Sequence, residues 1–118
     1  ICKGEIMNNC IFCKIINKEI KSEIVFENDF VIAIKDINPV APIHLLVLPK
    51  KHFVNLLDLN DDNILSEIFK AIKILSKQYN ISEKGFRVVN NCNKDGGQTV
   101  DHIHFHLLGG RFMTWPPG

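Results

Sequence analysis

Apolar residues recur along this chain in two different periods, and each period predicts one kind of element. After residue 60 they fall at spacings of one, three and four, as on one face of an amphipathic helix. Asn60 or Asp61 can cap the start of this helix with a side-chain oxygen. The apolar positions of the face are Ile64, Leu65, Ile68, Phe69, Ile72 and Leu75.

Short apolar or alternating runs bounded by turn residues predict five strands. They cover residues 23–27, 30–35, 43–48, 86–91 and 99–108. Asn28-Asp29 favours a hairpin between the first two runs, and Pro49 ends the third. The short apolar segment 10–16 is expected to form a helical turn. The predicted fold class is α+β: about five antiparallel strands, one long helix on one face and a short N-terminal helix.

The length and charge of the chain narrow the class of protein. Its 118 residues predict a single domain, with residues 1–9 an N-terminal extension that need not be ordered. The 14 basic and 13 acidic side chains leave a net charge of +1, so no strong field attracts nucleic acid or an anionic membrane. No apolar run is long enough to span a membrane, and residues 1–9 lack a signal-peptide pattern. We therefore expect a cytoplasmic location, or a nuclear one as well in a eukaryote.

The most unusual pattern is a run of three histidines at alternate positions: His102, His104 and His106. On a strand they share one face, spaced about 7 Å apart, while the apolar residues between them face the core. Three buried imidazoles carry six ring nitrogens that all need partners, so burial without a function is a poor explanation. Catalysis and metal binding are the two chemical alternatives.

The segment containing these histidines resembles the signature of the histidine triad (HIT) family. Residues 96–111 read GGQTVDHIHFHLLGGR. Further matching motifs are DINP at 36–39, HLLVLPKKH at 44–52 and WPPG at 115–118, so the likeness extends over almost the whole chain from Cys10. The nucleoside phosphoramidate hydrolases are the most similar branch.

This resemblance implies a HIT-like fold and an enzyme of the adenosine 5′-monophosphoramidase type. Its expected reaction is hydrolysis of the P–N bond of purine nucleoside 5′-phosphoramidates through a covalent nucleotidyl-histidine intermediate, with no cofactor needed for catalysis. Two alternatives stay open. One is a nucleotide- and zinc-binding scaffold or regulatory protein with little turnover, and the other is a dinucleoside polyphosphate hydrolase.

The resemblance assigns the nucleophile to His104, the central histidine. A neutral imidazole suits attack on an anionic phosphorus because it brings no negative charge. Either His106 or Thr99 could deliver the proton that the leaving amine needs. His44 is similar to a family position that extends and supports the triad, and His102 is its first member.

Other residues are candidates for binding the nucleotide. Asp36 resembles the family's ribose ligand, since one carboxylate can accept hydrogen bonds from both hydroxyls of a cis-diol. Phosphoryl oxygens could be held by Asn91, Gln98, Thr99 and the backbone N–H groups near Gly96-Gly97. The expected apolar slot for the base comprises Phe12, Ile15, Ile34 and Ile37. Asn90 is interpreted only as a turn-forming residue.

Cys10 and Cys13 form a C-x-x-C pair, which supplies half of a tetrahedral zinc site. The resemblance adds His52 and His102 as the other two ligands of a structural zinc, while two reduced buried cysteines are the alternative. The resemblance also implies a homodimer. In it the long helix and the 86–91 strand pair across a two-fold axis, and the tail with Trp115 reaches the partner's site.

Overall fold

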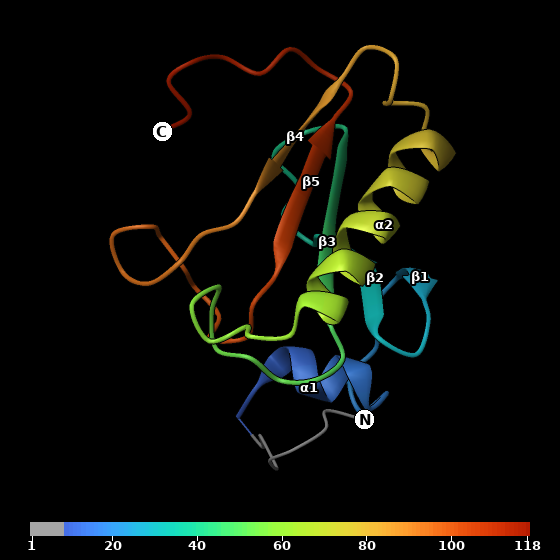
Figure 1. Ribbon diagram of the computed structural model, residues 1–118. Helices are drawn as coiled ribbons and strands as arrows, with labels where there is room; N and C mark the ends of the chain where they lie inside the picture. Colours follow the sequence, from blue (N-terminus) through green and yellow to red (C-terminus); the bar gives the residue numbers. More distant parts are fainter. Residues whose placement is uncertain (1–8) are drawn as a thin grey trace.

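The computed structural model describes residues 9–118, which form one antiparallel sheet and two helices (Figure 1). The elements are α1 (Ile11–Ile16), β1 (Ile24–Glu27), β2 (Val31–Lys35), β3 (Ile43–Pro49), α2 (Asp62–Gln78), β4 (Phe86–Val89) and β5 (Phe105–Gly109). The strand order is β1-β2-β3-β5-β4, and all four neighbouring pairs are antiparallel. The predicted α+β class, with one long and one short helix, is confirmed.

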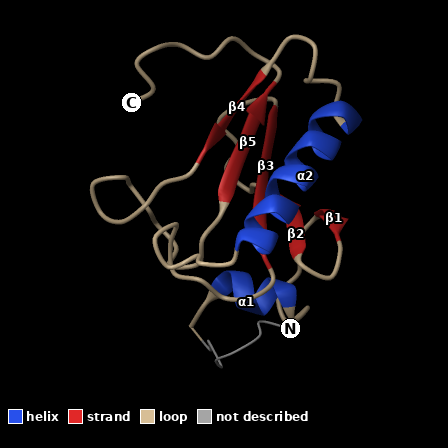
Figure 2. Ribbon diagram, viewed as in Figure 1, coloured by secondary structure: helices blue, strands red, loops and turns tan. Residues whose placement is uncertain are grey.

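The two central strands, β3 and β5, separate two apolar layers because successive side chains point to opposite faces. Leu45 and Val47 of β3, with Phe105 and Leu107 of β5, pack under α2 in one cluster. Figure 2 shows α2 lying along the sheet, with α1 at one end of it. The apolar residues between the histidines therefore do face the core, as the alternation predicts.

The opposite face of the same strands is covered in part by α1. Leu46 and Leu48 of β3 pack there with Phe12 and Ile15 of α1 in a second, smaller cluster. Since His44 precedes Leu46 by two residues and His106 is paired with Leu46 across the ladder, both histidines lie on this face. The sheet thus has one face for the main core and one that carries histidines.

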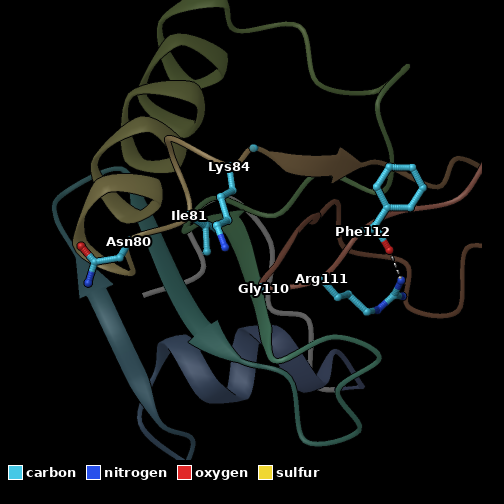
Figure 3. Close-up of a pocket in the computed structure, with 7 residues that line it drawn as sticks. Asn80, Ile81, Lys84, Gly110, Arg111 and Phe112 are labelled. Carbon is cyan, nitrogen blue, oxygen red and sulfur yellow. Dashed lines mark hydrogen bonds between the residues drawn. The ribbon is translucent and has the colours of Figure 1, made fainter.

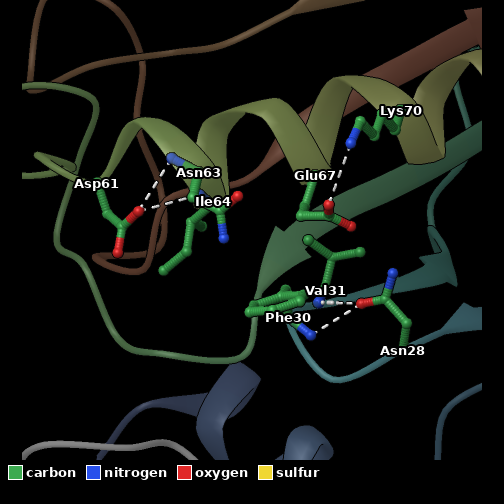
Figure 4. A network of polar contacts seen from close by, with 8 residues as sticks. All are labelled: Asn28, Phe30, Val31, Asp61, Asn63, Ile64, Glu67 and Lys70. Atoms are coloured by element: carbon green, nitrogen blue, oxygen red, sulfur yellow. Dashed lines mark hydrogen bonds and ion pairs between the residues drawn. The ribbon is translucent and has the colours of Figure 1, made fainter.

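The start of α2 agrees with the predicted capping. The Oδ1 atom of Asp61 accepts hydrogen bonds from the backbone N–H groups of Asn63 at 3.0 Å and Ile64 at 3.1 Å (Figure 4). These bonds satisfy donors that the first helical turn leaves without intrahelical partners. Asp61, rather than Asn60, is therefore the capping residue.

The hairpin between β1 and β2 is held by a side chain at its turn. The Oδ1 atom of Asn28 accepts from the N–H groups of Phe30 at 2.8 Å and Val31 at 2.9 Å (Figure 4). Asn readily forms this local bond to backbone two or three residues ahead. The predicted Asn28-Asp29 turn is confirmed.

The last strand is shorter than the predicted 99–108, since β5 begins only at Phe105. The β3–β5 register pairs Phe105 with Val47, so residue 103 would face Pro49 in a longer ladder. Pro49 has no N–H to donate, which stops the ladder near this point. Ile103 donates its N–H to the Phe53 carbonyl at 2.8 Å instead.

β4 also ends earlier than the predicted 86–91, at Val89. Its last paired residue faces His106. Beyond it the side chain of Asn90, rather than a backbone N–H, bonds to the carbonyl of His104. The Asn90 side chain thus supplies a hydrogen bond just beyond the last paired residues of β4 and β5.

Two further expectations concern the ends of the chain and the membrane. The proposed extension, residues 1–9, lies outside the described part of the chain except for Asn9. Among residues 9–118, neither helix has the length and apolar character needed to cross a membrane.

Candidate active site

Three histidines lie side by side on the face of the sheet that α1 partly covers, and we call them the histidine row: His44, His104 and His106. The rings of His44 and His106 have centroids 5.2 Å apart, and those of His104 and His106 are 5.1 Å apart. β3 supplies the first and β5 the last, while His104 lies just before β5. The row therefore places six ring nitrogens in a small volume.

Hydrogen bonds fix where the protons of the row lie. The N–H of Val40 donates to Nδ1 of His44 at 3.1 Å, so a neutral His44 carries its proton on Nε2. That Nε2–H in turn donates to Nδ1 of His106 at 2.9 Å. A neutral His106 must then carry its own proton on Nε2. The hydrogen bonds thus run from Val40 through His44 to His106, and the last ring has a free N–H donor at Nε2.

His104 has the opposite tautomer. Its Nδ1 lies 2.8 Å from the carbonyl oxygen of His102, which only accepts, so Nδ1 carries the proton and donates. The lone pair of a neutral His104 therefore lies on Nε2. Its ring packs edge-on against Phe12, with centroids 5.0 Å apart.

All three rings of the row favour the neutral form. Burial lowers the pKa of His44, with the nearby Asp36 carboxylate opposing this, and burial also lowers the pKa of His104. Burial, with the charges that His104 and His44 would carry, lowers the pKa of His106 to about 4. At neutral pH the row therefore combines a bare imidazole nitrogen with a neutral N–H donor.

Asp36 stands at the end of the row beside His44. Its Oδ2 lies 3.3 Å from Nε2 of His44, and its Oδ1 accepts the N–H of Asn38 at 2.8 Å. Each carboxylate oxygen has a second lone pair, so Asp36 can still accept hydrogen bonds from a ligand.

Asp36, His44 and His106 also lie close enough together to be considered as a metal site. The hydrogen bonds argue against this use. A metal would need the lone pair of His44 Nε2, but that atom carries the proton because Nδ1 accepts from Val40. The three groups are better suited to hydrogen bonding than to coordination.

A second group, which we call the Cys–His cluster, lies beside α1: Cys10, Cys13, His52 and His102. Nδ1 of His102 is 3.3 Å from the sulfur of Cys10 and 3.6 Å from that of Cys13, and Nδ1 of His52 is 3.3 Å from the Cys13 sulfur. All four ligand atoms lie within 4.8 Å of one another. His102 therefore belongs to this cluster rather than to the row, although it is the first histidine of the triad.

The geometry of the cluster fits a zinc ion. His102 donates Nε2–H to the Pro49 carbonyl at 2.9 Å, which leaves the lone pair of Nδ1 facing the two sulfurs. Tetrahedral zinc with its usual bond lengths places sulfur and nitrogen ligands about 3.5 Å apart, near the observed separations. The N–H of Cys13 also donates to the sulfur of Cys10 at 3.3 Å, which helps to fix the position of that sulfur.

The row and the cluster occur on a chain that matches a known family. The model of the HIT domain matches residues 17–113, which is most of the chain. This chain belongs to the HIT domain family. The expectation drawn from the motif at 96–111 is therefore confirmed.

Individual HIT proteins are similar to this chain over most of its length. The crystal structure of a HIT family hydrolase from Legionella pneumophila Philadelphia 1 has a TM-score of 0.90 and 52% identity, covering 93% of this chain and all of that one. The adenylylsulfatase HINT1 of Arabidopsis thaliana is 45% identical over 112 residues, covering 92% of this chain and 76% of that protein. A 14 kDa zinc-binding protein of Brassica juncea is also 45% identical over 112 residues, covering 92% of this chain and 98% of that protein.

The expected base slot of this HIT protein is only partly assembled. Phe12, Ile15 and Ile34 are all buried in the smaller apolar cluster. Ile37 lies apart from them in the loop after β2 and is 87% exposed. The loop carries two prolines, so the side chain does not continue the strand into the cluster.

The glycine-rich turn precedes His102 in the sequence, and the side chain of Gln98 bonds to backbone groups around it. The carboxamide of Gln98 donates to the carbonyls of Val54 at 2.7 Å and Val100 at 3.0 Å, and accepts the N–H of Asn93 at 2.9 Å. These contacts make Gln98 an anchor of the turn, and its role as a phosphate ligand stays a prediction. Asn91 is half-buried after β4, and Thr99 is exposed.

Sequence reasoning missed Asn90. Its Nδ2 donates to the backbone carbonyl of His104 at 3.0 Å, so the interpretation as a turn former is wrong. The available signal was its place directly after a strand that borders the histidine run. Neither residue type nor spacing distinguishes such a side chain from the adjacent Asn91.

A pocket of about 530 Å³ lies away from the row, where the chain leaves α2 and β5 (Figure 3). It is lined by Asn80, Ile81, Lys84, Gly85, Gly110, Arg111 and Phe112. The guanidinium of Arg111 donates to the Val40 carbonyl from Nε at 3.1 Å and from Nη2 at 3.0 Å. Arg111 thereby holds the residue whose N–H sets the tautomer of His44.

We expect His106 to make the stability of the fold sensitive to mild acid. Its pKa is about 4 in the folded chain against 6.5 for an ordinary histidine, so between these values the unfolded chain binds more protons and acid favours unfolding. The stabilisation is complete above about pH 6.5 and is lost as the pH falls toward about 4. His106→Gln should weaken this dependence, measured as the urea midpoint against pH. Parallel curves for the two proteins would contradict the assignment.

Proposed function

We propose that this HIT-family protein hydrolyses purine nucleoside 5′-phosphoramidates through a covalent nucleotidyl adduct on His104. The observation that carries the proposal is the tautomer of His104: Nδ1 donates to the His102 carbonyl, which leaves Nε2 with a lone pair. Burial lowers the pKa of this ring, so the lone pair is present at neutral pH. The similar protein named a HIT family hydrolase supports the same reaction class.

In the first step, Nε2 of His104 attacks the phosphorus and forms a P–N bond to it. The P–N bond to the substrate's amine breaks, and its electron pair leaves with the amine, which takes up a proton. The product is a nucleotidyl-imidazolium, because Nδ1 of His104 keeps its own proton. The Nδ1–H bond to the His102 carbonyl then helps to hold the positive charge.

His106 is the preferred source of the proton for the leaving amine. The chain of bonds from Val40 through His44 ends in an N–H on Nε2 of His106, beside the ring of His104. Such an N–H can donate to the amine or to a phosphoryl oxygen as charge develops there. Thr99, which is exposed, is the second candidate.

In the second step, water attacks the phosphorus and gives one proton to Nε2 of His106, replacing the proton lost to the amine. The bond to His104 breaks, with the electron pair returning to Nε2 of His104. The products are the nucleoside monophosphate and the free enzyme, so bonds and charges balance over the cycle. An imidazole leaves readily because it departs as a neutral ring.

The nucleotide would be oriented by residues around the histidine row, which would bind its ribose, base and phosphate. Asp36 retains lone pairs for the two ribose hydroxyls, and the exposed Ile37 in the same loop is the proposed contact for the base. Asn91 and backbone N–H groups near Gly96 and Gly97 are the proposed donors to the phosphoryl oxygens.

A second substrate follows from the name of one relative. The Arabidopsis protein is called an adenylylsulfatase, and an adenylyl sulfate also presents an adenylyl group joined to a leaving group. Transfer of that group to His104 would be the same first step with sulfate, rather than an amine, as the product. Dinucleoside polyphosphates and binding without turnover remain the alternatives to be distinguished by assay.

Wild-type protein mixed with an adenosine phosphoramidate should release the amine and show a transient mass increase of one adenylyl group. His104→Ala should fold but lose both signals, because no other ring of the row has a lone pair on an unbonded nitrogen. Intact-mass spectrometry after rapid acid quench, with amine release followed in parallel, is the measurement.

Matched variants identify the proton donor. His106→Gln and Thr99→Val are compared using substrates whose amines differ in basicity, since losing a general acid penalises poor leaving groups most.

Full turnover by His104→Ala would remove His104 as nucleophile. Nucleotide binding without amine release by the wild type would favour the scaffold alternative.

We also propose that the Cys–His cluster holds a structural zinc ion, with Cys10, Cys13, His52 and His102 as ligands. Three sulfur–nitrogen separations of 3.3, 3.3 and 3.6 Å support this, as does the name of the zinc-binding relative. When bound, zinc would tie α1 to the segment that precedes the nucleophile.

Protein purified under reducing conditions without added metal should contain about one zinc per chain, measured by elemental analysis. Cys10→Ser should lower the zinc content and the melting temperature, because a ligand is removed. Cys92→Ser is the matched control, since Cys92 is a free, half-buried cysteine outside the cluster. Zinc-free wild type with an unaffected Cys10→Ser would rule out the site.

We propose that the chain forms a homodimer through β4 and the adjoining side of α2. β4 lies at the edge of the sheet, and Phe86 on it is 38% exposed. Phe69 of α2 is 41% exposed although its ring contacts Phe105 of the neighbouring β5. Trp115, 80% exposed in the tail, is the residue proposed to approach the partner's site.

Light scattering should give twice the 13.5 kDa mass of the chain. Phe69→Lys should shift it toward the monomer, because a charge would enter the proposed interface. Ile74→Lys is the control: this side chain is 50% exposed and lies about 140° further round the helix. A wild-type monomer, or equal effects of both substitutions, would contradict the proposed interface.

A further inference from the structure

The side chain of Asn90 makes a hydrogen bond that has no counterpart in the regular sheet. Asn90 directly follows β4, and its Nδ2 donates to the backbone carbonyl of His104 at 3.0 Å. The partner residue is the proposed nucleophile, and the contact reaches its backbone rather than its ring. Asn90 therefore helps to fix the position of the His104 backbone.

The backbone around His104 needs such support because the ladder does not extend to it. β5 begins at Phe105, and β3 ends at Pro49. Ile103 is held by its N–H bond to the Phe53 carbonyl, on one side of the nucleophile. The bond from Asn90 holds the carbonyl of His104 itself. Two irregular bonds thus replace regular pairing at this point.

The orientation of the Asn90 amide leaves its oxygen without a hydrogen bond to any part of residues 9–118, which costs stability. Its Oδ1 is buried and has no hydrogen-bond partner among the described residues. Rotating the amide by half a turn would place an oxygen against the His104 carbonyl, so the bond requires the observed orientation. A buried acceptor without a partner is destabilising, and an apolar side chain of similar size would avoid that penalty.

We propose that Asn90 is a positioning residue for the nucleophile. By fixing the peptide of His104, it keeps Nε2 of that ring directed at the phosphorus while the N–H of His106 is directed at the leaving amine. The inference rests on the proposed function, since it concerns the alignment of the proposed nucleophile. It assigns the side chain to the speed of the chemical step and not to the stability of the fold.

Asn90→Leu separates these two roles. It removes the donor and also the buried, unpartnered oxygen. We expect kcat to fall roughly 10- to 100-fold, because small misplacements of reacting groups cost about that much, with KM little changed. The melting temperature should change little, because the unpartnered Oδ1 of Asn90 is removed while the carbonyl of His104 loses its donor. Asn90→Asp, which puts an acceptor opposite the carbonyl, should lose at least as much kcat.

Asn55→Ala is the matched control. It removes two hydrogen bonds of the neighbouring loops, one from Asn55 Nδ2 to Asn93 Oδ1 at 2.9 Å and one from the N–H of Asp58 to Asn55 Oδ1 at 3.0 Å, and neither involves His104. This variant should keep the wild-type kcat. The rate of adduct formation in a single turnover, measured for every variant, reports alignment directly.

The outcomes separate the two proposals. Wild-type kcat in Asn90→Leu would overturn the positioning role, and so would a loss of kcat matched by a lower melting temperature. If the wild type itself forms no adduct and releases no amine, the proposed function fails, whatever Asn90 does.

Discussion

The hydrogen bond from Nδ1 of His104 to the carbonyl of His102 is the constraint on which the site depends. It decides which nitrogen of the central ring has a lone pair, and therefore which atom can attack. A second, opposite arrangement makes His106 a donor, because the bonds start from the N–H of Val40 and pass through His44. The proposed nucleophile and the proposed donor, which have opposite tautomers, thus lie side by side without any formal charge on either ring.

Both centres of the molecule depend on the same few residues. His102 gives its ring to the Cys–His cluster and its carbonyl to His104. Its ring is held in turn by the carbonyl of Pro49, the residue at which regular pairing with β5 has already stopped. The irregular segment before β5 is therefore not a loose end of the strand. In this segment, hydrogen bonds that position the rings of His102 and His104 replace the backbone pairing of a regular strand.

Much of this could be predicted from the sequence, because it depends on periodicity. The alternation around the histidines placed Phe105 and Leu107 in the core, and the acidic residue before the long helix predicted its cap. The rest depended on contacts between distant segments. That Pro49 faces residue 103, that Gln98 binds Val54, and that Asn90 reaches His104 all follow from register and loop geometry, which residue types alone do not specify. The exposure of Ile37 has the same origin, since the proline-containing loop leads away from the strand.

The contact between Cys10 and His102 joins residues 92 positions apart in the sequence. During synthesis the first half of the Cys–His cluster leaves the ribosome long before the second half exists. A helix as short as α1 has little stability of its own, so it must wait for the sheet that covers it. The segment that packs against the proposed nucleophile is thus made before the sheet that it needs, and we expect its docking to be a late event in folding.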